Sequence, residues 1–281
     1  MLEMLSFNFM RTALIVAVFI GAASACIGQV VVLRRQANIG DALSHSALAG
    51  VALGVVLGMN PTILSLFGTL LAAFIIEFVR RLFPRYAEIA SAIVIAFSVG
   101  LAAILSGMSG SGKSFHSYLF GSIVTISPAE RNLTILLCTV VVLTSLLLYK
   151  ELFFLSFDPE SAKLAGINTA LVDIIFIIMT ALTVGIASKS VGTLVVSSLL
   201  VLPYATAMQL HLNYRNTLIA SIVLGALNTI LGVIASYKFS LAPGGTIVIL
   251  SVIVLLLAGI GNKIFMILRA SQIRSRAENA N

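Results

Sequence analysis

Residues 12–33 read TALIVAVFIGAASACIGQVVVL, a run without a single charged side chain. A helix that crosses the hydrocarbon core of a bilayer needs about 20 largely apolar residues. Eight further stretches resemble it: 41–59, 61–79, 87–107, 132–149, 169–188, 191–209, 216–237 and 246–268. The sequence therefore predicts an all-α, polytopic membrane protein with eight or nine spans. The two closely spaced pairs, 41–59 with 61–79 and 169–188 with 191–209, are also compatible with re-entrant hairpins.

The composition excludes a soluble fold. Hydrophobic residues make up 59% of the 281 residues and charged residues 10%, whereas a soluble domain contains about 25% charged residues. The same apolar content excludes disorder. Cys26 and Cys138 each lie within an apolar run, which excludes a disulfide framework and a CxxC metal site. We expect a single transmembrane domain over residues 1–281, with function confined to its helices and loops.

Lysine and arginine predict the orientation, because they accumulate on cytoplasmic loops. With the N-terminus outside, the cytoplasmic ends carry Arg34, Arg35, Arg80, Arg81, Arg85, Lys150, Lys163, Arg215, Lys263, Arg269, Arg274 and Arg276. The outer ends carry only Arg11, Lys113, Arg131, Lys189 and Lys238. We therefore expect an external N-terminus and a cytoplasmic C-terminus. The net charge of +7 is then explained by the inner loops and does not indicate nucleic-acid binding.

Asp41 and His45 are the clearest candidate site. Ionisable residues inside membrane spans are costly and indicate function by default. Their i,i+4 spacing places both side chains on one helix face, and a carboxylate with an imidazole suits zinc first, then manganese or iron(II). Two structural alternatives stay open: a buried hydrogen-bonded pair, or a helix-capping Asp41 beside an unrelated His45. A helix that begins at Asp41 would place the pair near the inner edge, whereas a midplane site needs an earlier start.

Other polar residues within or beside the spans are weaker candidates. Glu77 precedes Arg80 and Arg81, which predicts a local ion pair. Asp173 lies about one turn inside its span, where it is expected to reach the lipid headgroups.

Three residues are weak candidates for lining a translocation path. Ser44 lies in the same segment as Asp41 and His45. Pro203 removes a helical hydrogen bond and frees the carbonyl of Leu199, a break that is tolerated where it lines a cavity. His116 lies in the long outer loop, where it would meet an incoming cation.

Residues 107–114 (GMSGSGKS) fit the G-x-x-x-x-G-K-[ST] pattern of a phosphate-binding loop. The context does not fit, because the preceding run is a span rather than a strand and the loop is predicted to lie outside the cell. We interpret it as a Gly/Ser connection.

The segment 156–166 (SFDPESAKLAG) carries a helix start signal on the cytoplasmic side. Asp158 is suited to the N-cap, Pro159 to the first helical position, Glu160 to the first turn and Gly166 to the stop. A short capped helix beginning after Phe157 is either a docking element or an interfacial brace.

Taken together, these segments resemble the membrane permease subunit of the bacterial zinc/manganese/iron ABC importers, a type II importer architecture. The resemblance rests on VLRR (32–35), GDALSHSALAGVALG (40–54), YLFGSI (118–123), FDPE (157–160) with Ala162 and Gly166, VGTLVV (191–196), LPYATA (202–207) and APGGT (242–246). It covers nearly the whole chain, from about 12 to 268.

The resemblance implies a permease homodimer in the bacterial plasma membrane, two copies of a cytoplasmic ATPase subunit and an extracellular metal-binding protein. It implies that Asp41 and His45 contact the transported metal. It also implies that Phe157, Asp158, Pro159, Glu160, Ala162 and Gly166 belong to the coupling helix that docks on the ATPase.

The expected function is thus ATP-driven import of a divalent metal ion, zinc first, with manganese or iron(II) as the alternative in the same family. A gradient-driven secondary transporter is a further alternative, although mid-span carboxylates and paired repeats are not evident. The permease itself is expected to be no enzyme and to hold no permanent cofactor. An intramembrane metalloprotease is disfavoured because H-E-x-x-H does not occur.

Overall fold

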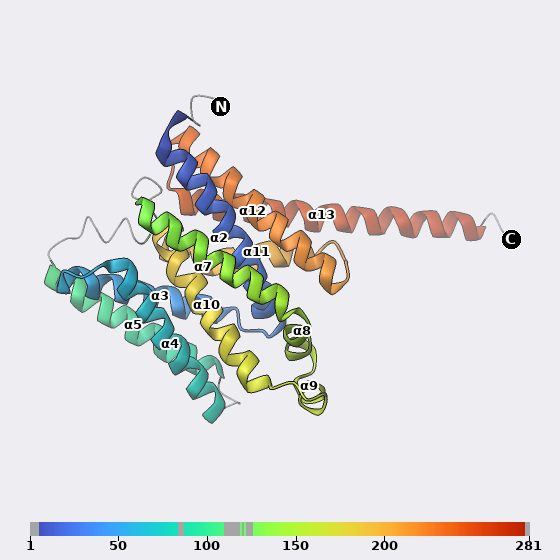
Figure 1. Cartoon of the computed structure of the whole chain (residues 1–281). Helices are drawn as coiled ribbons and strands as arrows, with labels where there is room; N and C mark the ends of the chain where they lie inside the picture. Colours follow the sequence, from blue (N-terminus) through green and yellow to red (C-terminus); the bar gives the residue numbers. More distant parts are fainter. Residues whose placement is uncertain (1–5, 84–86, 110–118, 120, 122–125, 279–281) are drawn as a thin grey trace.

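The computed structural model describes residues 6–83, 87–109, 119, 121 and 126–278, and all regular structure in these residues is helical. The helices are α2 (Asn8–Leu33), α3 (Asn38–Leu57), α4 (Pro61–Leu82), α5 (Ala87–Ser109), α7 (Pro128–Leu147), α8 (Tyr149–Phe157), α9 (Pro159–Leu164), α10 (Thr169–Val191), α11 (Thr193–Met208), α12 (Tyr214–Phe239) and α13 (Pro243–Glu278). They form one bundle from which the end of α13 projects (Figure 1).

Within these residues, eight helices are long and apolar enough to cross a membrane, which confirms the predicted class. The close pair α3 and α4 both qualify. As expected from the sequence, Pro61 opens α4, and the Asn60 side chain accepts a 2.9 Å bond from the backbone N–H of Thr62. By contrast, α11 covers the predicted 191–209 span with only 16 residues. It is about 24 Å long against a core of about 30 Å, so a ninth crossing stays a prediction.

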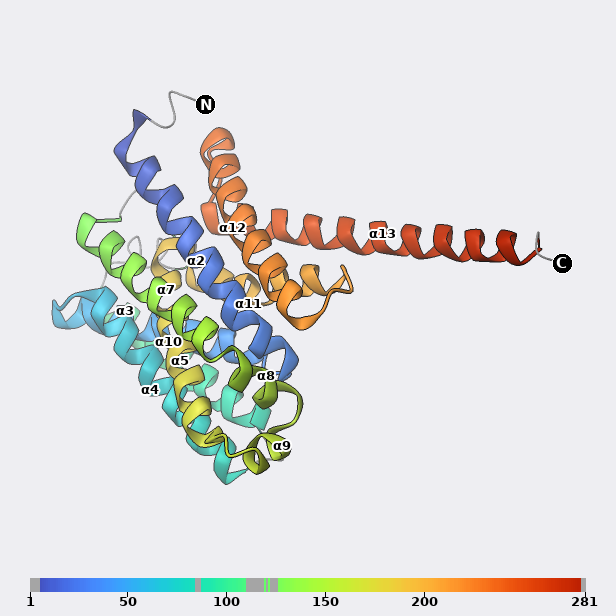
Figure 2. The same ribbon diagram turned by 45° about the vertical axis from the view of Figure 1, so that its right-hand side comes forward.

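The helix α2 is the centre of the bundle. It lies between α7 and α12 in both views and also contacts α10 and α11 (Figures 1 and 2). Small residues allow this close packing: a Cβ added at Gly28 would overlap the carbonyl oxygen of Leu200 in α11. The Thr229 hydroxyl of α12 also donates a 2.9 Å bond to the Ala17 carbonyl of α2.

Charged and polar side chains join the helices at two opposite ends of the bundle. One end brings together Arg34, Arg80 and Asp173, from the end of α2, the end of α4 and the start of α10. The other brings together Thr62, Glu130 and Lys189, from the start of α4, the start of α7 and the end of α10. Each group unites residues that the sequence places on one side of the membrane, and the alternation of these helices across it stays a prediction. Which end faces the cytoplasm stays a prediction.

The helix α13 packs on α11 and α12 near its start and then extends away from the bundle (Figures 1 and 2). Its exposed large hydrophobic side chains include Ile249, Ile253, Leu256, Leu257, Ile260 and Ile264. An apolar outer surface is what a helix in lipid requires, because the surrounding solvent is itself hydrocarbon.

Candidate metal site and coupling surface

The turn between α2 and α3 sets the start of the helix that carries Asp41 and His45. Gln36 N–H donates to the Val31 carbonyl at 2.9 Å and Arg35 N–H to the Val32 carbonyl at 3.0 Å, the hydrogen-bond pair of a Schellman motif. Arg35 takes the left-handed position with φ +56°. A side chain there costs about 1–2 kcal/mol relative to ordinary backbone, so the surrounding packing must hold this tight turn.

Asp41 and His45 lie on the outer face of the first two turns of α3. His45 Nε2 is 3.7 Å from Asp41 Oδ1, and the side chains are 21% and 49% exposed. The neighbouring residues Ile39, Gly40, Ala42, Leu43 and Ser44 are all buried. A separation of 3.7 Å is too long for a hydrogen bond, so the two side chains face one another as a loose ion pair.

Two of the structural alternatives left open by the sequence do not fit this geometry. The pair is not fully buried, and Asp41 is not the N-cap because α3 begins at Asn38, after Ala37. The helix therefore begins three residues before Asp41, later than the start near Arg34 that a midplane site would need. Cation binding by the pair stays a prediction.

One chain supplies only part of a metal coordination shell. No group of three or more His, Cys, Asp or Glu side chains is close enough to hold a metal among the residues that the structure describes. Zinc takes about four ligands and manganese about six. A metal ion bound to this pair would take its remaining ligands from water, from backbone oxygens or from another chain.

Behind the pair, α3 is held closely by α4 and α5. Ser46 and Ser98 share a 2.8 Å hydrogen bond between α3 and α5. A Cβ added at Gly50 would overlap the carbonyl oxygen of Leu64 in α4 and lie 2.9 Å from the Ser65 Cα. The small residues of this segment thus allow close helix approach, as the sequence predicts.

Of the three weaker path candidates, Ser44 and Pro203 lie among the described residues. The buried Ser44 hydroxyl donates to the Gly40 carbonyl at 2.7 Å, within its own helix. Pro203 lies inside α11 and is buried. His116 and residues 110–114 of the phosphate-loop pattern lie outside the described residues. A path role for these residues stays a prediction.

The segment 156–166 folds as its sequence predicts. The Asp158 carboxylate caps α9 by accepting from Ser161 N–H at 3.0 Å, and Pro159 opens the helix. The hydrogen bonds from Ser161 lower the pKa of Asp158, which keeps the cap charged. Ala162 is fully buried, Glu160 is exposed, and Gly166 ends the element with φ +83°.

An aromatic cluster lies beside this segment. The Phe153 ring is 4.9 Å from the Phe157 ring and 4.9 Å from the Tyr214 ring, and Tyr149 is 5.1 Å from Tyr214. Phe157 nevertheless remains 58% exposed. One face of its ring is therefore held by the permease while the other is free to contact a partner.

Sequence reasoning assigned Asp173 to the lipid headgroups, and this prediction is wrong. Asp173 Oδ1 accepts a 2.7 Å bond from Arg34 Nη1 and lies 3.5 Å from Arg80 Nη2. The predicted pair of Glu77 with Arg80 and Arg81 is confirmed at 2.5 and 2.7 Å. Burial lowers the pKa of Arg34 and the nearby Asp173 carboxylate opposes the shift, so the guanidinium stays charged. The available signal was an acid one turn inside a span whose start is predicted to lie on the same side of the membrane as Arg34 and Arg80.

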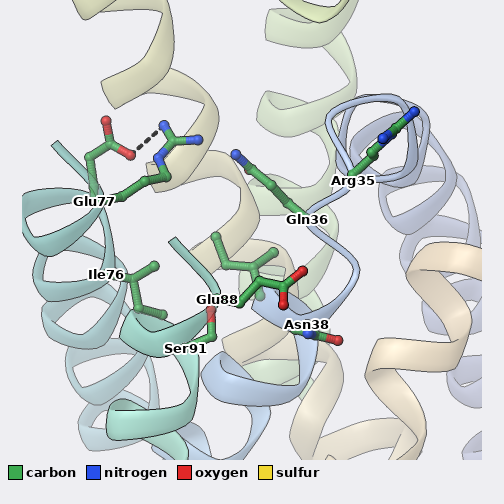
Figure 3. Close-up of a pocket in the computed structure, with 9 residues that line it drawn as sticks. Arg35, Gln36, Asn38, Ile76, Glu77, Glu88 and Ser91 are labelled. Atoms are coloured by element: carbon green, nitrogen blue, oxygen red, sulfur yellow. Dashed lines mark ion pairs between the residues drawn. The ribbon is translucent and has the colours of Figure 1, made fainter. Parts of the chain in front are cut away.

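A small pocket borders this charged group (Figure 3). It is lined by Arg35, Gln36 and Asn38 from the α2–α3 turn, with Glu77 and Arg80 of α4 and Glu88 of α5 among the others. Figure 3 shows the Glu77 ion pair on one side of the pocket and Glu88 near Asn38 on the other. The start of the metal-pair helix thus adjoins the charged network.

The fold and the site together define a multi-pass membrane protein that exposes a metal-binding type of side-chain pair on one helix. The model of the ABC 3 transport family matches residues 6–262, and the chain belongs to this family. It is the membrane subunit of a metal ABC importer, located in the plasma membrane.

Individual relatives agree with this assignment. A protein of Treponema pallidum named "Probable metal transport system membrane protein" is 37% identical over 90% of this chain and 96% of its own length. The manganese import system permease protein ScaB of Streptococcus parasanguinis is 31% identical, covering 90% of each chain. The manganese transport system membrane protein MntC of Listeria monocytogenes is 30% identical over 91% of each chain.

Two solved structures share the fold. PsaBC from Streptococcus pneumoniae, in complex with Fab, superposes with a TM-score of 0.80 at 29% identity, over 90% of this chain and 91% of that chain. An inward-facing metal-chelate type ABC transporter superposes with a TM-score of 0.71 over 89% of this chain and 84% of that chain. At 19% identity it supports the fold alone.

Proposed function

We propose that this chain is the permease of an ATP-driven manganese importer and that Asp41 and His45 bind the ion during its passage. The observation that carries the proposal is the partly exposed carboxylate–imidazole pair of Asp41 and His45, 3.7 Å apart on an otherwise buried stretch of α3. A carboxylate and an imidazole suit manganese, zinc and iron(II) alike. Manganese is favoured over the zinc expected from the sequence because the relatives whose names specify a metal name manganese.

A second copy of the chain completes the site in this proposal. With one Asp41–His45 pair from each copy, the ion would have four protein ligands, and water would fill a six-coordinate shell. The 49% exposed Asp41 is compatible with such a site, because an exposed carboxylate is accessible to a neighbouring chain.

ATP hydrolysis takes place on a separate cytoplasmic subunit, and an extracellular binding protein delivers the metal. The docking element for the ATPase is the segment 156–166, in which α9 is capped at both ends and the half-free Phe157 ring provides an apolar anchor. An aromatic residue in a groove carries a large share of docking energy. This role requires the N-terminus outside and the C-terminus in the cytoplasm.

The experiment is metal accumulation in a deletion strain that expresses the wild type, Asp41→Ala or His45→Ala, with manganese, zinc and iron(II) supplied separately. We expect wild-type cells to accumulate manganese and both variants to lose accumulation while their proteins still reach the membrane. If wild-type cells accumulate zinc but not manganese, the substrate is zinc and the manganese proposal is wrong. Normal manganese uptake in both variants would reject the site.

A further inference from the structure

The coupling helix α9 is joined to α10 without a flexible linker. Ile167 N–H donates to the Ala162 carbonyl and Gly166 N–H to the Lys163 carbonyl, both at 3.0 Å, which closes α9 with a Schellman motif. The Asn168 side chain then caps α10 by accepting from Leu171 N–H at 3.1 Å. A displacement of α9 must therefore move the first turns of α10.

The first turns of α10 contact Arg34, which lies at the end of α2 just before the turn into α3. Asp173, four residues after the start of α10, bonds Arg34 at 2.7 Å, and the two side chains are only 18% and 13% exposed. The Arg34 guanidinium also lies 5.6 Å from the ring centre of Phe176, one turn further along α10. Arg34 ends α2, and the tight turn that follows it leads directly into α3.

We infer that the Arg34–Asp173 pair is a positioning link, through which movement of the coupling helix reaches the metal-binding pair on α3. This inference rests on the proposed function of the segment 156–166 and of Asp41 and His45. The path runs from α9 to the start of α10, across the ion pair to Arg34, and through the α2–α3 turn to Asp41. Neither Arg34 nor Asp173 contacts the transported ion in this scheme.

An ion pair is suited to this task because its energy depends on the distance between the two charged groups, here 2.7 Å between Arg34 Nη1 and Asp173 Oδ1. Arg80 of α4 lies 3.5 Å from the same Asp173 oxygen and is itself held by Glu77. Asp173 thus contacts both arginines, and in this scheme a movement of α10 changes its distance to Arg34 and with it the position of the α2–α3 turn. Coupling between distant sites requires an element whose equilibrium both sites bias, and in this scheme that element is the start of α10.

The test uses the complete complex of permease, ATPase and manganese-loaded binding protein in lipid nanodiscs. Asp173→Asn keeps the size of the side chain and removes its charge, and Arg34→Gln removes the charged guanidinium but leaves a shorter polar side chain. We expect stimulation of ATP hydrolysis by the binding protein to fall roughly tenfold in each variant. Basal hydrolysis, ATPase retention and manganese binding should stay unchanged, and the double variant should resemble either single variant because both remove the same contact.

Glu130→Gln is the matched control. Glu130 and Lys189 form an ion pair of similar exposure, 18% and 19%, which joins α7 to α10 at the opposite end of the bundle. The control should lower the thermal stability of the complex as much as Asp173→Asn does, but keep full stimulation. Arg34→Lys retains the charge without the two-pronged donor and should give intermediate stimulation, a test that remains available if Arg34→Gln fails to assemble.

Normal stimulation in Asp173→Asn and Arg34→Gln would overturn the link. Losses that equal those of Glu130→Gln and follow thermal stability would also overturn it, because the pair would then be only a brace. Failure of the proposed coupling surface gives a different result: Phe157→Ala would retain the ATPase with full stimulation.

Discussion

Asp41 and His45 derive their chemistry from an unusual local setting, a polar pair on the outer face of a helix whose other early residues are buried. Asp41→Asn keeps the size of the side chain but removes its negative charge, and His45→Gln removes the imidazole. Each change should lower manganese uptake at least about tenfold, since even changes outside the first ligand shell cost 10–100-fold. Transport should be measured in vesicles that contain the ATPase and the loaded binding protein, and uptake at the wild-type rate would contradict the assignment.

Gly50 shows how a single missing side chain places the metal helix. Gly50→Ala would press a Cβ against the backbone of Leu64 and Ser65, and overpacking of this kind costs about 1–3 kcal/mol. Gly100→Ala on α5 is the matched control, because nothing lies within 4 Å of its Cβ position. The detergent-solubilised Gly50→Ala protein should melt at a lower temperature than the wild type, whereas Gly100→Ala should melt at the same temperature or slightly higher. Equal melting of both variants would show that α3 and α4 are not closely packed.

At the scale of the element, the coupling segment depends on one aromatic anchor. Phe157→Ala should cost about 2 kcal/mol of docking energy, roughly a 30-fold loss of ATPase affinity. Phe154→Ala is the control, since Phe154 is 39% exposed and its ring neighbour is Phe153. Co-purification of the ATPase across a range of concentrations measures both affinities. Equal retention in the two variants would reduce the segment to a brace.

The cap of α9 has its own pH dependence. Because the folded-state pKa of Asp158 is lowered by hydrogen bonds from Ser161, the capping contribution is complete above the ordinary aspartate pKa of about 3.9 and is lost only as pH falls below it. The cap should therefore cause no change in the stimulation of ATP hydrolysis between about pH 5 and 8. Asp158→Ala should weaken stimulation of ATP hydrolysis across that range, while Asp158→Asn should preserve it. The contradicting result would be a stimulation of ATP hydrolysis that changes with pH near neutrality in the wild type but not in Asp158→Asn.

The elements were largely predictable from the sequence, because their signals are local. Apolar runs identified the spans, and the order Asp158, Pro159, Glu160 and Gly166 identified α9 to the residue. The Arg34–Asp173 contact was not predictable, since 139 positions separate its partners and the sequence does not say which spans are neighbours. The full ligand set of the proposed metal site was not predictable for the same reason, because ligands far apart in the sequence, or on a second chain, leave no local signal.

At the scale of the whole molecule, the orientation can be tested with introduced thiols. Cys26 and Cys138 are both buried, so background labelling should be low. Leu164→Cys, at a position 90% exposed on α9, should react with a membrane-impermeant reagent only from the cytoplasmic side. Met59→Cys, between α3 and α4 and 54% exposed, should react only from outside. The reversed pattern would place the C-terminus outside and exclude ATPase docking on α9.

The whole molecule presents two charged junctions, one at each end, that tie α4 and α10 to different neighbours. The junction of Arg34, Asp173 and Arg80 adjoins both the coupling helix and the start of the metal helix, whereas the junction of Thr62, Glu130 and Lys189 adjoins neither α9 nor the first turns of α3. This asymmetry is why substitutions at the two ends should separate stability from coupling.

The central claim, that Asp41 and His45 bind the transported ion, is tested most directly by electron paramagnetic resonance of Mn²⁺ bound to the purified complex. Coordination by His45 predicts a nitrogen coupling on the manganese signal that disappears in His45→Gln, and a bound signal that weakens in Asp41→Asn. A bound manganese signal whose nitrogen coupling is unchanged in His45→Gln would contradict the account.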